Sequence, residues 1–351
     1  MQVEQADILM QGLFPPDVPG AALTILWEEG CFSQGYGLAD LGTGAHITPD
    51  TAFRIASLTK QFTARAIHIL QSQEFLSLQE PIGPYFPAFP AALGQITPGQ
   101  LLHHSSGVSD YEALLSSDRT ESIDDREVET LIAAKGFLYF SPGTAFRYSN
   151  TGYCLLARLL EKASGLSFGQ YIDQHIFTPL AMAHSRVFEP AVLIPNRAYG
   201  YHRAGPQWCW ADQDVTSTTQ GDGGIYISAN DFRKWIIAGR GLRIAKGPPS
   251  DQPSPGLQDV PVWYQDGWFV GEETDGSPCW FHSGESTGFR HIAYCNDMHE
   301  RAVILFSNGD DDRVERAFSA LAEMLSLSPT LGRYDSSLYR WLHQVYQAGS
   351  G

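Results

Sequence analysis

A serine and a lysine three residues apart, Ser57 and Lys60, have the clearest chemical potential in this sequence. Residues at this spacing share one face of a helix, so the two side chains would lie within reach of each other. A serine hydroxyl becomes a nucleophile at neutral pH when a neighbouring group takes its proton, and a desolvated lysine can do this. An N-capping serine beside a solvated lysine would show the same spacing, so the pair alone does not establish acyl transfer.

Tyr148 and Asn150 could supply further groups for the same reaction. They lie at an expected junction between a loop and a helix, where a side chain can be directed into a cleft. A tyrosine flanked by cations can act as a general base, and an asparagine can orient a lysine or a substrate amide. The alternative is core packing by the tyrosine and helix capping by the asparagine.

A third segment, His282, Ser283 and Gly284, falls on an expected strand. A glycine there would let a substrate approach the backbone, and the histidine would supply a tunable positive charge or a hydrogen-bond donor. The backbone N–H of Glu285 could form an oxyanion hole together with the N–H of Ser57. A half-exposed strand histidine without a chemical role is the alternative.

The elements that must position these residues follow the order strands, helices, strands, helix. Residues 20–40 are typical of a hairpin and 51–56 of a short strand, while apolar residues at helical spacing predict a buried helix over 57–72. Asn150 or Thr151 is expected to cap another helix. The remaining predictions are a helix start at Thr97-Pro98, a helix end at Gly165, strands at 225–227, 267–270, 279–283, 288–295 and 302–307, helices at 231–238, 313–325 and 337–346, and an exposed loop at 247–256.

This order predicts an α/β (α+β) fold in which an antiparallel sheet is flanked by helices and a mainly helical region is inserted. The expected boundaries are 1–56 and 216–330 for a discontinuous sheet domain, 57–215 for the helical domain and 331–351 for a C-terminal extension. The 351 residues, 43% of them hydrophobic, suffice for a large core. A cleft between the sheet and the helical region is the natural place for a site.

Charge and composition exclude several classes of protein. A formal net charge of −16 argues against nucleic-acid binding and against electrostatic docking on anionic membranes. We expect no membrane span, because no apolar stretch approaches roughly 20 residues. The five cysteines form no metal-ligand cluster, and His103-His104 lacks a third ligand at suitable spacing. We expect a cytoplasmic protein, or a periplasmic or secreted one if a signal peptide was removed, and the oligomeric state stays open.

Taken in order, the three segments resemble the serine β-lactamase and penicillin-binding protein superfamily. The Tyr-x-Asn second motif is similar to that of class C β-lactamases, family VIII esterases, D-aminopeptidases and serine DD-carboxypeptidases. The resemblance covers roughly residues 15 to 325. Supporting stretches lie at 53–60, 101–107, 146–150 and 221–226.

The resemblance implies a β-lactamase/transpeptidase-like fold and a role for each site residue. Ser57 would be the nucleophile, and Lys60 its electrostatic activator and proton relay. Tyr148 would be the base and later the acid for the leaving group, while Asn150 would hold Lys60 and the acyl amide. The N–H groups of Ser57 and Glu285 would form the oxyanion hole. Whether lysine or tyrosine takes the first proton is left open by the sequence.

The third motif departs from the class C pattern, which has lysine where this chain has His282. A histidine is only partly charged near pH 7 and suits the carboxylate of a β-lactam less well. His-x-Gly is closer to the pattern of D-amino-acid peptidases and DD-carboxypeptidases. Glu285 would disfavour anionic substrates unless it is turned away or paired, for instance with Arg290. Ser283, Gly284 and Arg290 are expected to bind the substrate.

These patterns predict a serine hydrolase that works through an acyl-enzyme, without cofactor or metal, on a carboxyl ester or a small D-amino-acid amide or peptide. The ester is slightly favoured, because an aromatic segment could line the cleft and the third-motif lysine is missing. That segment contains Tyr201, His202, Trp208 and Trp210.

Three alternatives stay open. The chain could be a DD-carboxypeptidase or a weak class C-like β-lactamase. It could be an inactive binding module of the same fold. It could also be an α/β-hydrolase with Ser286 as nucleophile, because residues 284–288 match G-x-S-x-G, but that elbow requires a helix after the serine.

Overall fold

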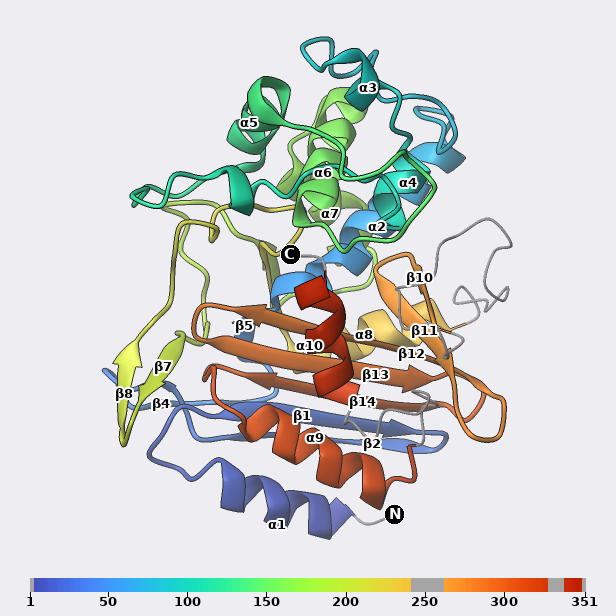
Figure 1. The fold of residues 1–351 in the computed structure, drawn as a ribbon. Helices are drawn as coiled ribbons and strands as arrows, with labels where there is room; N and C mark the ends of the chain where they lie inside the picture. Colours follow the sequence, from blue (N-terminus) through green and yellow to red (C-terminus); the bar gives the residue numbers. More distant parts are fainter. Residues whose placement is uncertain (1–2, 241–261, 328–337, 349–351) are drawn as a thin grey trace.

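The computed structural model describes residues 3–240, 262–327 and 338–348. The loop predicted at 247–256 lies outside these residues. Among the described residues, seven strands form one antiparallel sheet in which the two ends of the chain meet (Figure 1). The order across this sheet is β10 (Trp263–Gln265), β11 (Trp268–Glu272), β12 (Pro278–Ser286), β13 (Phe289–Asn296), β14 (Arg301–Ser307), β1 (Ala21–Trp27) and β2 (Gly30–Tyr36). The predicted sheet built from the first and last parts of the chain is therefore confirmed.

Helices cover both faces of this sheet. In Figure 1, α1 (Val3–Leu13), α9 (Arg313–Met324) and α10 (Leu338–Ala348) lie in front of the strands, and α8 (Ala229–Gly239) lies behind them. The central strands β1 and β14 are mainly apolar and are buried except at Trp27 and Arg301, as expected for strands that are covered on both faces. The core therefore lies between the sheet and its two helical layers.

The helical region lies beyond one long edge of the sheet and is built around two buried helices, α2 (Lys60–Ser72) and α6 (Asn150–Ser164). The helix predicted over 57–72 is confirmed, except that its first turn is a 3-10 turn, η1 (Ala56–Thr59). The other helical elements here are α3 (Ala91–Gly94), α4 (Pro98–Leu102), η2 (Glu112–Leu114), α5 (Asp125–Lys135), α7 (Phe168–Ile172) and η3 (Asp173–Phe177).

Some strands pair outside the main sheet. The segments predicted at 51–56 and 225–227 are strands, but they join each other and a strand of the inserted region in a separate small sheet. Its order is β5 (Ala52–Arg54), β9 (Ile225–Ser228) and β6 (Ser185–Val187). The hairpins are β3 (Leu38–Asp40) with β4 (Ala45–His46), and β7 (Tyr201–Ala204) with β8 (Gln207–Trp210). The inserted range therefore contains strands as well as helices.

The capping predictions are partly right. Thr97 caps α4 in a capping box, and Gly165 ends α6 with a φ of 75°. The expectation that Asn150 or Thr151 caps α6 was wrong, because Ser149 is the N-cap and accepts a hydrogen bond from the Gly152 N–H. The side chain of Asn150 therefore does not cap the helix and can make other contacts.

The aromatic segment predicted to line the cleft forms the β7–β8 hairpin instead. The Tyr201 hydroxyl accepts a hydrogen bond from the Leu41 N–H, and Trp208 packs under the Arg313 guanidinium. In Figure 1 this hairpin lies at the side of the sheet away from α10 and β10. Its aromatic residues therefore serve packing at the rim of the sheet.

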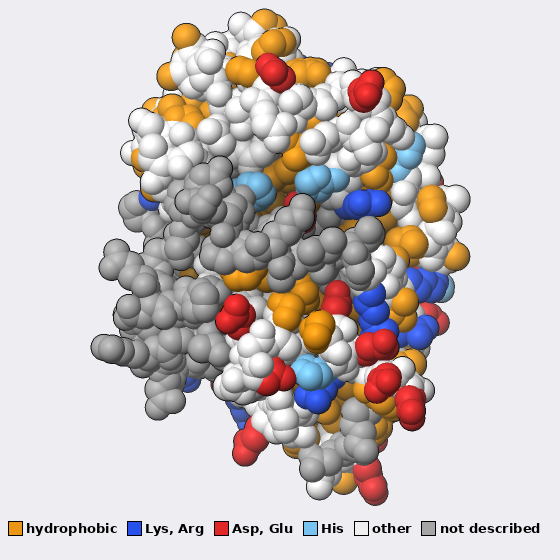
Figure 2. Space-filling view, turned by 90° about the vertical axis from the view of Figure 1, so that its right-hand side faces the viewer, with side chains coloured by type: hydrophobic (Ala, Val, Ile, Leu, Met, Phe, Trp, Pro, Cys, Tyr) orange, Lys and Arg blue, Asp and Glu red, His pale blue; other side chains and the backbone are white. Residues whose placement is uncertain are grey.

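The surface carries charges of both signs on its sheet half. Figure 2 shows acidic and basic side chains interspersed there, while the helical half of the same face is mainly uncharged. On this face the basic groups do not merge into the continuous patch that nucleic acid requires. Among the described helices, none combines the length and apolar character that a membrane crossing demands.

Candidate active site

The structure brings Ser57, Lys60 and Asn150 together at the junction of the sheet and the helical region. The Lys60 ammonium donates hydrogen bonds to Ser57 Oγ at 2.9 Å, to Asn150 Oδ1 at 2.8 Å and to the carbonyl oxygen of Asp222 at 3.0 Å. These acceptors come from η1, α6 and the loop before β9. They match the three protons of an ammonium group, so the charged lysine is held in one position.

Burial makes Lys60 an unusually weak base. Its side chain has no exposed surface, and the loss of hydration lowers the pKa of Lys60 from its ordinary value to about 8, although the nearby Asp222 opposes the shift. At pH 7 roughly a tenth of the molecules would then hold a neutral lysine. A neutral amine 2.9 Å from a serine oxygen is suited to take the hydroxyl proton.

Tyr148 lies beside the pair. The Lys60 ammonium is 5.0 Å from the centre of its ring. Burial raises the pKa of Tyr148 far above its ordinary value, although the proximity of Ser57 opposes the rise. Its hydroxyl has no hydrogen-bond partner of regular geometry among the residues that the structure describes. The phenol is therefore protonated at neutral pH and is suited to donate a proton.

His104 positions Tyr148 and was not singled out from the sequence as a site residue. The two rings are 4.3 Å apart, and His104 Nδ1 accepts a hydrogen bond from the Ser149 N–H at 3.1 Å. Burial holds the pKa of His104 well below its ordinary value, so the ring is neutral and carries its proton on Nε2. The one sequence signal was its place in the stretch 101–107.

Two features fix Ser57 at the start of α2. Ala56 has a left-handed φ of 48°, a strained conformation for a residue with a side chain, directly before the serine. Strand β12 also runs against the chain at this point, because a Cβ on Gly284 would lie 2.2 Å from the Ile55 carbonyl oxygen. Gly284 therefore allows β12 to approach the backbone beside Ser57, rather than making room for a substrate as we had expected.

The third-motif histidine is neutral in the structure. His282 is fully buried, and burial lowers its pKa to about 3, so the expected positive charge is absent at pH 7. Its Nε2 lies 3.2 Å from the Tyr264 hydroxyl and its Nδ1 lies 3.3 Å from that of Tyr346. The prediction of a tunable charge at this position was wrong, while hydrogen bonding by the ring is retained.

Strand β12 presents a partly open edge near Ser57. In the described part of the chain, its pairing with β11 spans Pro278 to Phe281, and the strand then continues to Ser286 without this neighbour. A substrate backbone could pair with such an edge. The turn after Ser286 leads directly into β13, which excludes Ser286 as the nucleophile of an α/β-hydrolase elbow.

Arg290 is directed elsewhere than expected. It lies opposite Glu285 in the β12–β13 register, and alternate side chains of a strand point to opposite faces. Because Gly284 faces Ile55, Glu285 and Arg290 face the other side, where they line a cavity of about 370 Å³ beneath α10. Arg290 donates a hydrogen bond to the Asp311 carbonyl oxygen at 3.3 Å. The structure thus places it away from Ser57, and it does not support the predicted substrate contact.

Acidic residues surround the site, and no motif in the sequence had pointed to them. Glu112 accepts a hydrogen bond from Asn150 Nδ2 at 3.0 Å, which fixes the amide with its oxygen toward Lys60. Burial and then the neighbouring Asp110 raise the pKa of Glu112 to about 7. The site is therefore better suited to neutral or cationic substrates than to anions.

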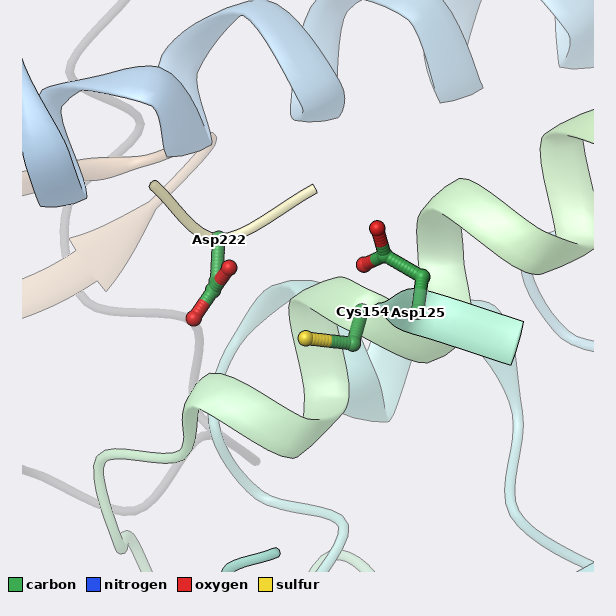
Figure 3. A group of neighbouring side chains, drawn as sticks. All are labelled: Asp125, Cys154 and Asp222. Carbon is green, nitrogen blue, oxygen red and sulfur yellow. The ribbon is translucent and has the colours of Figure 1, made fainter. Parts of the chain in front are cut away.

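Asp125, Cys154 and Asp222 form a buried cluster close to this site (Figure 3). It is the group within the described residues that has the spacing of a metal centre. However, Asp125 accepts hydrogen bonds from the N–H groups of Gln220 and Gly221, and burial raises the pKa of the Cys154 thiol well above its ordinary value. Both oxygens of the Asp125 carboxylate are thus engaged by this loop, so the cluster is better explained as a brace for the segment that supplies the Asp222 carbonyl.

Comparison with known proteins agrees with this geometry. The model of the beta-lactamase family matches residues 13–326. Penicillin-binding protein 4* of Bacillus subtilis is 27% identical over 323 residues, which cover 86% of this chain and 71% of that protein. Protein flp of Staphylococcus aureus is 26% identical, with 85% of this chain and 61% of its own length covered. The chain thus spans about two thirds of the length of these relatives.

A solved structure shows the same fold. D-amino acid amidase from Ochrobactrum anthropi, determined in complex with L-phenylalanine, superposes with a TM-score of 0.74 at 23% identity, over 92% of this chain and 98% of its own. The fold and the site together define a serine hydrolase of the β-lactamase and penicillin-binding protein superfamily. The chain belongs to the beta-lactamase family.

Proposed function

We propose that this protein hydrolyses carboxyl esters or small D-amino-acid amides through an acyl-enzyme on Ser57. The observation that carries the proposal is the buried Lys60, which hydrogen-bonds Ser57 Oγ at 2.9 Å and has its pKa lowered to about 8. A binding module would have no need for a buried lysine at a serine hydroxyl. Burying an ammonium is costly, and such groups are concentrated at functional sites.

In the proposed reaction, neutral Lys60 takes the proton of Ser57 as Oγ attacks the substrate carbonyl. The backbone N–H groups of Ser57 and Glu285 would stabilise the oxyanion. Tyr148 then donates its phenol proton to the leaving group as the bond from the carbonyl carbon to that group breaks, and it recovers a proton from the Lys60 ammonium, so that the acyl-enzyme forms with Lys60 neutral again. Water releases the acid product by the same steps in reverse order. Asn150 keeps Lys60 in position throughout.

The choice between ester and amide depends on the charge around the site. Glu112 and Asp110 lie near Lys60, and a free substrate ammonium would be attracted to them. This favours an amide of a D-amino acid with a free amino group as the second candidate, and the amidase likeness supports it. Penicillins carry a carboxylate, which suits the neutral His282 poorly. We therefore expect β-lactam hydrolysis to be weak.

The test is intact-protein mass spectrometry and turnover with a short-chain nitrophenyl ester, a D-alanyl amide and a penicillin. We expect an adduct on the wild-type protein, and we expect loss of the adduct and at least a thousandfold loss of turnover in Ser57→Ala, because the covalent route is removed. Ser286→Ala is the matched control and should keep the wild-type rate. Unchanged activity in Ser57→Ala, or no adduct with any of the compounds, would contradict the proposal.

A further inference from the structure

Helix α10 lies outside the residues that the family model matches, yet it reaches the active site. The family match ends at residue 326, whereas α10 begins at Leu338. Trp341 is fully buried and packs its ring edge-on against Phe269 at 5.4 Å and Phe281 at 5.7 Å. These contacts fix α10 on strands β11 and β12, the strands that border the site.

The last turn of α10 brings Tyr346 next to Tyr148. Their ring centres are 4.7 Å apart, and the ring of Tyr346 lies 6.0 Å from that of His282. Figure 1 shows the C-terminal end of α10 at the junction between the sheet and the helical region. Since Tyr148 is the proposed proton donor to the leaving group, Tyr346 lies on the leaving-group side of the site.

The Tyr346 hydroxyl contacts the polar side chains of the third motif, Ser283 and His282. Ser283 Oγ donates a hydrogen bond to it at 3.0 Å, and His282 Nδ1 lies 3.3 Å away. Because the Ser283 carbonyl oxygen accepts the proton of His282 Nδ1 at 2.5 Å, the Ser283 hydroxyl is the donor that a substrate group at this end of β12 would otherwise meet. The phenol thus takes the place of such a substrate group.

A carboxylate on the leaving group would find a poor environment here. It would have to displace the Tyr346 hydroxyl from its hydrogen bond with Ser283. The neighbouring ring of His282 is buried and neutral. Placing an unpaired carboxylate in such surroundings is unfavourable, so a leaving group without a charge is preferred.

We propose that Tyr346 is a specificity-determining residue that closes the His282–Ser283 end of the cleft to leaving groups that bear a carboxylate. The inference rests on the proposed acyl-enzyme function. It assigns to this chain a substrate class with an uncharged leaving group. It also assigns a role in substrate choice to the C-terminal helix.

The test compares two esters that share one D-alanyl acyl group and differ in the leaving group, which ends in a carboxylate in one and a carboxamide in the other. We expect wild type to prefer the carboxamide in kcat/KM by about tenfold or more. Tyr346→Phe frees Ser283 while keeping the ring, and should reduce this preference severalfold. Tyr346→Ala should reduce it further. Gln347→Ala, at an exposed position of the same helix turn, is the control and should keep the wild-type ratio.

A purely structural role for Tyr346 would lower kcat/KM for both esters by the same factor, and an unchanged ratio in Tyr346→Phe would overturn the inference. If Tyr346→Ala does not fold, Tyr346→Phe decides alone, because it keeps the packing against Tyr148. Mass spectrometry of wild type separates the two proposals. An absent adduct on Ser57 would reject the hydrolase itself, whereas a normal adduct with an unmoved ratio would reject only the role of Tyr346.

Discussion

At the scale of single residues, each group around Lys60 has one role in the proposed reaction. The carbonyl of Asp222 and the amide of Asn150 hold the amine, and Glu112 fixes the orientation of that amide. When the ammonium loses a proton, Ser57 is the partner that can donate one back, since a carbonyl oxygen cannot. The hydrogen bonds around Lys60 therefore favour proton transfer between Lys60 and Ser57 in the proposed reaction.

The rate of Ser57 acylation should follow the titration of Lys60. The pKa of Lys60 is lowered to about 8, and the neutral form is the active base. We expect the acylation rate to rise about tenfold per pH unit below pH 8 and to level off above it. If Tyr148 were the base, the rate would keep rising well beyond pH 9, because burial raises the pKa of Tyr148. Stopped-flow acylation by a nitrophenyl ester between pH 6 and 10 distinguishes the two.

Glu112 needs a control in this experiment, because its pKa is raised to about 7 and it contacts Asn150. In Glu112→Gln the inflection near pH 8 should persist. It should also persist in Tyr148→Phe, at a lower overall rate. An inflection that vanishes in Glu112→Gln would show that the carboxyl group, and not Lys60, sets the profile.

The sequence could supply Ser57, Lys60 and Tyr148, because side chains with reactive groups recur at a recognisable spacing. It could not supply the Asp222 contact, since a backbone carbonyl leaves no trace in residue type. Nor could it supply the charge of His282, which depends on burial by residues from distant segments. The residue types of the proposed site could therefore be identified from the sequence, but their protonation states could not.

At the scale of elements, the approach of β12 to the chain before Ser57 sets the geometry of the site. Gly284 permits this approach, since an added Cβ would lie 2.2 Å from the Ile55 carbonyl oxygen. Real Cβ atoms do not come so close, so the strand or the segment before Ser57 would have to move. Displacement of about 1 Å in an active site can reduce a rate by about a hundredfold.

We therefore expect Gly284→Ala to reduce kcat for the ester by about a hundredfold and to leave the protein folded. The matched control is Gly12→Ala on α1, where an added Cβ meets nothing within 4 Å. It should keep the wild-type rate. Circular dichroism and steady-state kinetics on both variants provide the check, and a wild-type rate in Gly284→Ala would show that β12 can shift at no cost to the site.

Local signals predicted most elements well, and long-range pairing accounts for the misses. Six of the seven described strands of the main sheet were placed to within a few residues, because alternation and turn residues mark them locally, whereas the short edge strand β10 was not predicted. The small sheet was missed, since pairing of β5 with β9 joins segments more than 170 residues apart. The cap of α6 was misplaced by one residue, because Ser149, Asn150 and Thr151 are all suitable caps.

At the scale of the whole molecule, a buried acidic cluster links the helical region to the loop that leads into β9. Asp125 at the start of α5 accepts hydrogen bonds from the N–H groups of Gln220 and Gly221, and Asp222 follows directly. Burial, reinforced by Asp222, raises the pKa of Asp125 from its ordinary value to about 7. The folded protein therefore binds a proton that the unfolded chain releases near pH 4.

This difference in proton binding means that Asp125 makes the folded protein less stable as the pH rises. Because the folded state binds more protons between about pH 4 and 7, Asp125 lowers the free energy of unfolding as the pH rises through this range, by about 4 kcal/mol at most. Asp125→Asn removes the titration and keeps one acceptor oxygen. We expect its melting temperature, measured relative to wild type, to rise from pH 5 to about pH 7 and to level off by pH 8. The control is Asp17→Asn, at an exposed position, whose melting temperature should change with pH in the same way as that of wild type. If the melting temperature of Asp125→Asn also followed that of wild type at every pH, Asp125 would have the same pKa in the folded and the unfolded chain.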